Sequence, residues 1–223
     1  GLSGAGAVVG LELQAAIDKL GDLDYTSRTT AARAVRRTSA GQAVPALIQA
    51  VGEHQDGYVR YRALVLLTGF NDPRTTDVMR ASLASPNDRL RAVAYNFFEH
   101  RPDRAMAPDF LAALDKELGE FVRPALVRTL AAHTVVVDDS RLRNTLLREV
   151  GRGEDYFRSA VIEALGDYKA RFAYDALVDV GKLEGPLQDD AVLALGKIGD
   201  ARALNLLGTL QRSGSRRIQP IVA

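Results

Sequence analysis

The chain has 223 residues, of which 47% are hydrophobic and 26% charged, and an apolar fraction this high excludes an intrinsically disordered protein. It contains no Cys, which excludes disulfides, thiolate zinc sites, iron–sulfur clusters and cysteine nucleophiles. Its 29 Lys and Arg against 28 Asp and Glu give a formal charge of +1, which argues against nucleic-acid binding as its main task.

Residues 1–10 (GLSGAGAVVG) are small, uncharged and rich in Gly. They lack the basic start and the long apolar stretch of a signal peptide, and no stretch of the chain reaches the about 18 uncharged apolar residues of a membrane span. We therefore expect a flexible N-terminal segment over residues 1–10 and a folded region over residues 11–223.

From residue 11 onward, one pattern repeats along the chain. An arginine recurs at intervals of 32, 31, 32 and 35 residues, and a glutamine takes its place 30 residues later, a mean period of 32. One apolar series lies seven residues after this position, and another lies eight or nine residues before it. Three series that keep one period indicate a repeat protein. The repeated residues are Arg28, Arg60, Arg91, Arg123, Arg158 and Gln188, and the later apolar series is Val35, Leu67, Phe98, Leu130, Leu165 and Leu195.

Each repeat is predicted to form two helices. In the second repeat, apolar residues over 44–51 follow helical spacing, a polar turn follows at 53–57, and a second apolar face runs over 59–70. An acidic residue three or four positions before each repeated arginine suits the N-cap of the second helix. We expect each arginine to pair with that acid or with its counterpart in the next repeat. The acids are Asp24, Asp56, Asp88, Glu120 and Asp155.

One pair of helices cannot bury both apolar faces, so neighbouring pairs must stack into an all-α solenoid. Residues 56–64, 155–166 and 194–203 resemble HEAT repeats of the phycobilisome-lyase-like (PBS lyase HEAT-like) class. The resemblance covers about residues 11–210 and implies an α-α superhelix of about six to seven HEAT-type two-helix repeats. Residues 213–223 begin a further second helix, so we expect the last repeat to be incomplete.

The sequence offers little for catalysis. His100 and His133 occupy similar positions in adjacent repeats and could hold a metal together with Glu99, but we favour surface histidines near helix C-termini. No metal-binding HExxH, nucleophile GxSxG or phosphate-binding loop is present. HEAT-type iron hydroxylases carry repeated His-Glu pairs, whereas this chain has only the reversed pair Glu99-His100. We therefore predict no catalytic residue, no cofactor and no bound metal.

The surface of the second helices is the predicted binding face. The residue five positions after each repeated residue should point outward, and this series loses its positive charge along the chain. A nucleic-acid groove would need Lys or Arg at most of these positions. The outward series is Arg33, Val65, Asn96, Arg128, Glu163 and Leu193.

The N-terminal end of this face is locally basic. Arg28, Arg33, Arg36 and Arg37 share one predicted helix, which could equally be an ordinary solvated helix face. Arg outnumbers Lys by 24 to 5, a bacterial-like composition that we attribute to a GC-rich genome. Among the aromatic residues, we expect Tyr61 and Tyr95 to be exposed anchors. The candidate protein-binding residues are Arg33, Arg36, Arg37, Tyr61, Arg62, Asn96 and Arg128.

Three functions are compatible with these patterns. The leading one is a non-catalytic HEAT-repeat scaffold that binds a protein with an acidic surface across its concave face and basic N-terminal end. The resemblance also implies a bilin-lyase-like enzyme subunit as an alternative. A HEAT-like DNA-repair or nucleic-acid-binding protein is the third, but the chain has no Trp and little excess positive charge. We expect a protein partner, no nucleic acid and a cytoplasmic location, and the sequence does not assign an oligomeric state.

Overall fold

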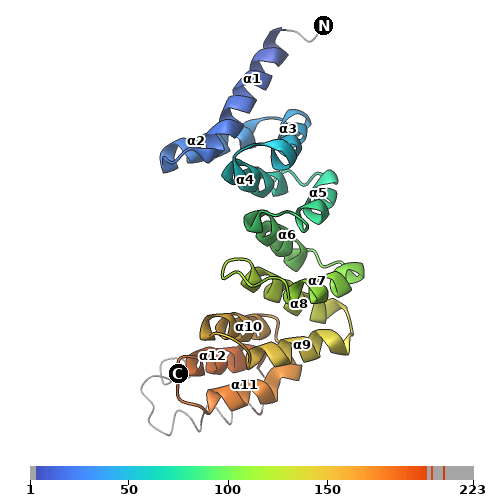
Figure 1. Ribbon diagram of the computed structural model, residues 1–223, viewed down its shortest axis with the longest axis vertical. Coiled ribbons are helices and arrows are strands. Elements are labelled where there is room, and N and C mark those ends of the chain that lie inside the picture. Colours follow the sequence, from blue (N-terminus) through green and yellow to red (C-terminus); the bar gives the residue numbers. More distant parts are fainter. Residues whose placement is uncertain (1–3, 200–201, 203–207, 209–223) are drawn as a thin grey trace. The chain divides into compact units, whose positions relative to one another are not determined.

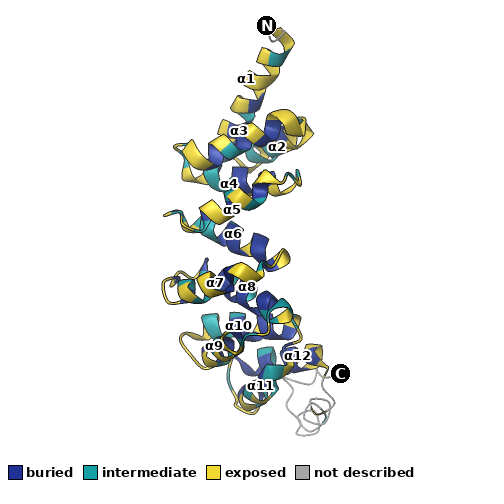
Figure 2. Ribbon diagram, turned by 90° about the vertical axis from the view of Figure 1, so that its right-hand side faces the viewer, coloured by how far each residue is buried: buried dark blue, intermediate teal, exposed yellow. Residues whose placement is uncertain are grey.

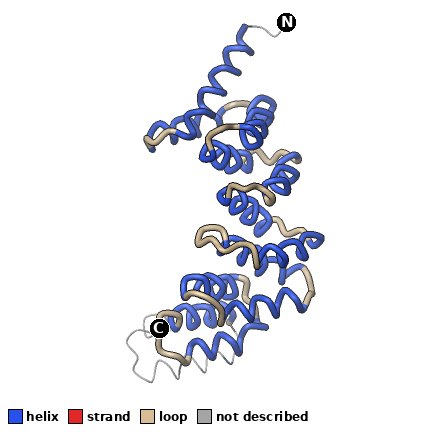
Figure 3. Tube along the Cα trace, in the orientation of Figure 1, coloured by secondary structure: helices blue, strands red, loops and turns tan. Residues whose placement is uncertain are grey.

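A computed structural model describes residues 4–199 of the chain, together with residues 202 and 208. This part consists of helices and connecting loops, with no β-strand among its residues (Figure 3). The predicted all-α class is therefore confirmed. None of the described helices combines the length and the apolar content needed to cross a bilayer. The incomplete repeat predicted for residues 213–223 lies outside the described residues.

The chain divides into two compact units, Gly1–Ala94 and Tyr95–Ala223. The division falls within a helix, inside the single solenoid that the sequence predicts for residues 11–223. The helices of the first unit form consecutive pairs along the chain (Figure 1). They are α1 (Gly4–Asp18) and α2 (Tyr25–Arg37), joined by the 3-10 turn η1 (Lys19–Gly21), then α3 (Ala40–Glu53) and α4 (Gly57–Thr68), then α5 (Arg74–Ser82) and α6 (Asp88–His100), within which the second unit begins.

The second unit packs its helices in two layers. The second helices of successive pairs, α8, α10 and α12, contact one another in that order, and the first helices α7, α9 and α11 do the same. With α1–α6, the described residues contain six helix pairs, as predicted for HEAT-type repeats. The helices are α7 (Ala107–Leu114), α8 (Arg123–Val136), α9 (Ser140–Val150), α10 (Asp155–Asp167), α11 (Tyr174–Gly181) and α12 (Gln188–Ile198), with 3-10 turns η2 (Arg104–Met106) and η3 (Arg171–Ala173).

The core lies between the paired helices, where the faces that meet are buried (Figure 2). The apolar series seven residues after the repeated position is buried in all six repeats: Val35, Leu67, Phe98, Leu130, Leu165 and Leu195. Burial of one such side chain contributes about 1.5–3 kcal/mol, which explains why the period is visible in the sequence.

The repeated arginines bind the ends of preceding helices. Each donates to a backbone carbonyl near the C-terminus of the preceding first helix or in the loop that follows it, where helical carbonyls lack intrahelical partners. The predicted pairing of each arginine with the acid before it is confirmed for Arg158, whose Nη1 lies 3.8 Å from Asp155 Oδ1. It is wrong for Arg28 and Arg60, which make these carbonyl bonds instead, and for Arg123, which pairs with Glu149. The pairs are Arg28 Nη1 with Asp22 and Leu23 (both 3.0 Å), Arg60 Nε with Val51 (2.8 Å), Arg91 Nη1 with Ser85 (2.9 Å), Arg123 Nη1 with Leu114 (2.6 Å), Arg158 Nε with Val150 (2.7 Å) and Gln188 Nε2 with Gly181 (3.1 Å).

The predicted acidic N-caps are confirmed at two positions. Asp24 accepts from the Ser27 backbone N–H at 2.9 Å, and Asp56 accepts from the Tyr58 N–H at 2.8 Å. The prediction is wrong at the other three positions. Asp88 and Asp155 lie inside the first turn of their helices, where a carboxylate meets the positive end of the helix dipole without being the cap, and Glu120 lies in the loop before α8.

Helix α1 begins at Gly4, so residues 4–10 are helical where the sequence predicts a flexible segment. The buried residues of α1 are Leu13 and Ile17, in its C-terminal half, and most of its N-terminal turns are exposed (Figure 2). Extending an existing helix fixes one residue for each hydrogen bond gained, whereas starting one fixes several. A helix anchored at Leu13 and Ile17 can therefore extend through exposed residues that make no core contact.

Candidate protein-binding site

A hollow of about 320 Å³ opens between the second helices α2 and α4 of the first unit. Its lining combines three arginines and two tyrosines with apolar side chains, and it includes no carboxylate. The lining residues are Leu20, Tyr25, Arg28, Thr29, Ala32, Arg36, Tyr61, Arg62, Val65 and Leu66. The hollow therefore presents positive charge beside apolar surface.

Helical spacing brings the α2 residues onto one wall of the hollow. Tyr25, Arg28, Ala32 and Arg36 lie three or four residues apart, and side chains at this spacing share one face of a helix. Arg33 and Arg37 belong to the same helix and are exposed, but they do not line the hollow. The structure thus separates the predicted basic helix into a wall of the hollow and a basic rim outside it.

Two of the lining arginines are held in place by backbone carbonyls. Arg28 Nη1 donates to two carbonyls in the turn before α2, and its guanidinium lies 5.7 Å from the centre of the Tyr25 ring. Arg62 Nη1 reaches from α4 to the carbonyl of Leu20 at 2.6 Å. A guanidinium has five N–H donors, so each of these arginines keeps further donors while its position is fixed.

These basic residues make no ion pair with any residue in the described part of the chain. The group consists of Arg28, Arg33, Arg36, Arg37 and Arg62, and the described ion pairs of the first unit involve other residues. The nearest acid in the sequence, Asp24, is engaged as the cap of α2. The backbone hydrogen bond from Ser27 is the main reason that the pKa of Asp24 lies below its usual value. The charges of Arg33, Arg36 and Arg37 therefore face solvent without an ion pair to a described carboxylate, whereas Arg28 and Arg62 are partly buried and bonded to backbone carbonyls.

The two predicted aromatic anchors, Tyr61 and Tyr95, differ in their exposure to solvent. Tyr61 is half-buried and lines the hollow. Tyr95 is only 3% exposed, and its hydroxyl donates to Glu117 Oε2 at 2.9 Å, so the expectation of an exposed anchor is wrong there. Tyr58 is also exposed, and its ring centre lies 5.3 and 5.1 Å from the guanidinium carbons of Arg62 and Arg89.

The remaining two candidates belong to the second unit. Asn96 is exposed on α6. Arg128 is half-buried and makes two ion pairs, with Glu99 Oε2 at 3.2 Å and with Asp167 Oδ2 at 3.0 Å. Its charge is therefore already balanced within the unit, unlike that of the α2 arginines.

Arg128 is the centre of a polar network across four second helices, α6, α8, α10 and α12. The Tyr168 hydroxyl donates to Glu99 Oε2 at 2.5 Å, and Lys197 Nζ lies 2.6 Å from Asp167 Oδ1. Burial works against the charged form of Asp167, but its bonds to Lys197 and Arg128 hold its pKa below the usual value. Burial, reinforced by the bond to Glu99, raises the pKa of Tyr168 from 10.0 to about 12.

This raised pKa predicts a distinct alkaline titration. Between pH 10 and about 12, Tyr168 keeps its proton in the folded chain and loses it in the unfolded chain, so its contribution to stability is lost as the pH rises through that window. Ultraviolet absorbance of tyrosinate should show a late step near pH 12 that loses the amplitude of one tyrosine in Tyr168→Phe. The exposed-site control Tyr25→Phe should keep that step, and identical curves for Tyr168→Phe and the parent chain would contradict the assignment.

The histidines form no metal centre in the described part of the chain, where no cluster of three potential ligands occurs. His133 is fully buried, which corrects the expectation of a surface histidine. Its Nδ1 lies 2.7 Å from the Thr129 carbonyl, and its Nε2 accepts from the Asp103 backbone N–H at 3.1 Å. Both ring nitrogens are therefore engaged, Nδ1 within α8 and Nε2 in joining α8 to the loop that follows α6.

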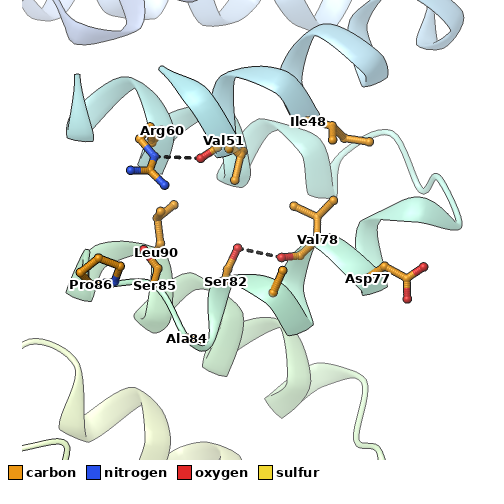
Figure 4. Close-up of a pocket in the computed structure, with 12 residues that line it drawn as sticks. Ile48, Val51, Arg60, Asp77, Val78, Ser82, Ala84, Ser85, Pro86 and Leu90 are labelled. Atoms are coloured by element: carbon orange, nitrogen blue, oxygen red, sulfur yellow. Dashed lines mark hydrogen bonds between the residues drawn. The ribbon is translucent and has the colours of Figure 1, made fainter. Parts of the chain in front are cut away.

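Another hollow in the first unit, of about 470 Å³, is mostly apolar (Figure 4). Its one lining arginine, Arg60, is bonded to the Val51 carbonyl, and its one acid, Asp77, lies at its edge. A hollow of about 550 Å³ in the second unit mixes arginines and carboxylates, including the ion pair of Arg123 and Glu149. The α2–α4 hollow differs from both because no described carboxylate is among the residues that line it.

Sequence reasoning missed Tyr25 and Ala32 as parts of the site. The signal was available, because Tyr25 directly follows the cap Asp24 and shares the helical face of Arg28 and Arg36. The role of Leu20 could not be predicted in the same way. Leu20 lies in the turn before α2, and its carbonyl accepts from Arg62, which is 42 residues later in the sequence.

Comparisons with known proteins match this arrangement of helices. A family profile described as HEAT repeats matches residues 13–97, and one described as PBS lyase HEAT-like repeat matches residues 187–213. An X-ray structure of YibA from Escherichia coli is similar with a TM-score of 0.63 and 17% identity, over 95% of this chain and 80% of that one. This likeness shows the fold alone.

A structure of human deoxyhypusine hydroxylase in complex with glycerol is 16% identical over 98% of this chain and 96% of that one. Its TM-score of 0.43 is too low to carry an argument. No curated protein matches the chain significantly.

Proposed function

The chain belongs to the HEAT-repeat proteins of the PBS-lyase-like class, and from this premise we propose that it is a non-catalytic scaffold that binds an acidic protein. The observation that supports the proposal is the group of five arginines on α2 and α4 that have no carboxylate partner among the described residues. In a HEAT solenoid the second helices line the concave face, which is the usual binding surface of repeat proteins.

Binding would depend on several contacts made at once. An exposed pair of opposite charges contributes about 0.2–1 kcal/mol, so a single arginine cannot hold a partner. The α2–α4 surface offers charged, aromatic and aliphatic groups within one hollow, and Tyr and Arg are the residue types that dominate the energy of protein interfaces. Because both helices are packed against the core, these groups are already in position before a partner arrives.

The second unit lacks the free positive charge that a nucleic-acid groove would need, which favours a binding site confined to the first unit. Several of its arginines are paired with carboxylates, among them Arg123, Arg128 and Arg141. The outward series also ends in Glu163 and Leu193, both exposed. A phosphate backbone would meet attractive charge on α2 and α4 but little on the second helices of the second unit.

The non-catalytic part of the proposal is supported by the state of the buried polar groups. His133, Glu99, Glu117 and Glu149 are all buried, and each is hydrogen-bonded to a neighbour within its own unit. Such groups stabilise the stack of helices, whereas a general acid or base needs access to a substrate.

The test is charge reversal on the basic rim. We expect the double variant Arg33→Glu/Arg37→Glu to bind a purified partner, identified by affinity capture of the full-length protein, about tenfold more weakly or worse. Both side chains are exposed and make no contact that the fold depends on. The matched control is Arg104→Glu/Arg171→Glu, which reverses two exposed arginines at the starts of η2 and η3.

Equal affinities for the rim variant and the control variant would overturn the proposal that the basic end binds the partner. Salt-sensitive binding of duplex DNA at physiological ionic strength would instead support the nucleic-acid alternative. A new visible absorption band on mixing with a bilin would support the lyase alternative.

A further inference from the structure

The α2 wall of the hollow carries two arginines whose backbone positions have a defined spacing. Arg28 and Arg36 both line it and are eight residues apart, which corresponds to about 12 Å along a helix axis. An extended peptide advances about 3.3 Å per residue, so it covers this length in about four residues. Side chains four residues apart in an extended peptide point to the same side. Acidic side chains at positions i and i+4 of a bound segment would therefore reach both arginines.

The surface midway between these arginines is apolar. Ala32 lies four residues from each of them, and Val65 and Leu66 face it from α4. Val65 is 41% exposed, so this apolar surface is open to solvent. In an extended segment, the side chain at i+2 points the same way as those at i and i+4. An apolar side chain there would lie on Ala32 and Val65.

The opposite wall adds a third positive charge and an aromatic face. Arg62 is fixed by its bond to the Leu20 carbonyl, and Tyr61 precedes it on α4. Among the described residues, no carboxylate lines the hollow to compete for these groups. A ligand segment that matches the charge of the hollow therefore carries two or more negative charges. Its apolar centre favours a peptide over a phosphate chain, because an evenly charged backbone offers nothing to cover that surface.

We infer that the hollow between α2 and α4 binds an extended segment of the partner with the pattern acidic–x–apolar–x–acidic. The inference rests on the proposed function and names the part of the acidic partner that the scaffold recognises. The two acids lie on Arg28 and Arg36, the apolar side chain lies on Ala32 and Val65, and Arg62 adds a third favourable charge from across the hollow.

The probe is a fluorescein-labelled peptide with the core Glu-Thr-Leu-Thr-Glu, whose β-branched threonines favour an extended chain. We expect a saturable rise in anisotropy with the whole chain. A peptide with Gln at both ends should bind about tenfold more weakly or worse, and so should a peptide of the same composition with adjacent glutamates.

The protein variants are chosen to leave the fold intact. Arg36→Gln removes an exposed guanidinium that holds no described residue, and Val65→Asp places a negative charge at the exposed centre of the hollow. Each should weaken binding of the probe about five- to tenfold, whereas the matched control Arg171→Gln should bind it like the parent chain. Thermal melts of all three variants check that they remain folded.

Equal binding of the three peptides, or equal binding of the probe by Arg36→Gln and Arg171→Gln, would overturn the inference. Displacement of the probe by duplex DNA at physiological salt would overturn it in favour of a nucleic acid. The proposed function is tested separately: it is overturned if the purified partner binds Arg33→Glu/Arg37→Glu as tightly as it binds the parent chain. A partner that depends on the rim, together with a probe that does not bind, would leave the scaffold function standing and remove only this segment pattern.

Discussion

Arg123→Ala is expected to lower the free energy of unfolding by about 3 kcal/mol or more, because it leaves a buried carboxylate without its closest partner. Arg123 Nη2 lies 2.7 Å from Glu149 Oε2, and the Glu149 side chain is 3% exposed. The same guanidinium also donates to the carbonyls of Leu114 and Glu117, at 2.6 and 2.9 Å. One substitution therefore removes an ion pair and two hydrogen bonds that join the ends of α7 and α9 to α8.

The control uses the same carboxylate. Arg148 is ion-paired with Glu149 Oε1 at 3.4 Å, but its side chain is 53% exposed. We expect Arg148→Ala to cost less than about 1 kcal/mol, because solvent screens the pair. Urea denaturation of both variants measures the difference. Equal losses would contradict the assignment of the repeated arginine to the structure of the stack.

Gly166→Ala and Gly52→Ala are expected to change stability in opposite directions. A Cβ added at Gly166, in α10, would lie 2.7 Å from the Ala194 Cα and 2.8 Å from its Cβ, so helix α12 would have to move away. Forcing extra atoms into a packed interface costs typically about 1–3 kcal/mol. A Cβ at Gly52, in α3, meets no described atom within 4 Å, so alanine there should stabilise the helix by about 0.4–1 kcal/mol.

Thermal unfolding of these two variants tests the close approach of α10 and α12. We expect a lower midpoint for Gly166→Ala and a slightly higher one for Gly52→Ala. A midpoint for Gly166→Ala at or above that of the parent chain would show that the two helices do not meet at this glycine.

The helix pairs could be predicted from the sequence because buried apolar residues recur at the same position of each repeat. Val35, Leu67 and Leu130 recur at the same place in successive repeats, and each is buried against the partner helix. The earlier apolar series has a second role that residue types do not reveal. Val51 and Val150 also supply the carbonyl oxygens that accept from Arg60 and Arg158. A backbone acceptor leaves no mark in the sequence, so the charge pattern predicts only the neighbouring acids as partners of the arginines.

The arginines of the site could also be predicted from the sequence, because a run of basic residues without acidic neighbours is visible in the sequence itself. Arg33, Arg36 and Arg37 lie on one exposed helix, as predicted. The burial of individual polar residues could not be predicted from the sequence in this way. Tyr95 reaches Glu117, 22 residues along the chain, and His133 reaches Asp103 across 30. Whether such a side chain faces solvent depends on how adjacent repeats stack, which a helical pattern within one repeat does not contain.

The most direct test of the account is a chemical footprint of the arginines. Phenylglyoxal modification of the chain, with and without the purified partner, reports by mass spectrometry which guanidinium groups a partner covers. We expect protection of Arg36, Arg37 and Arg62, while Arg104 and Arg171 react equally in both samples. Unchanged reactivity on α2 and α4, with protection at Arg104 or Arg171 instead, would contradict a binding surface built from the second helices of the first unit.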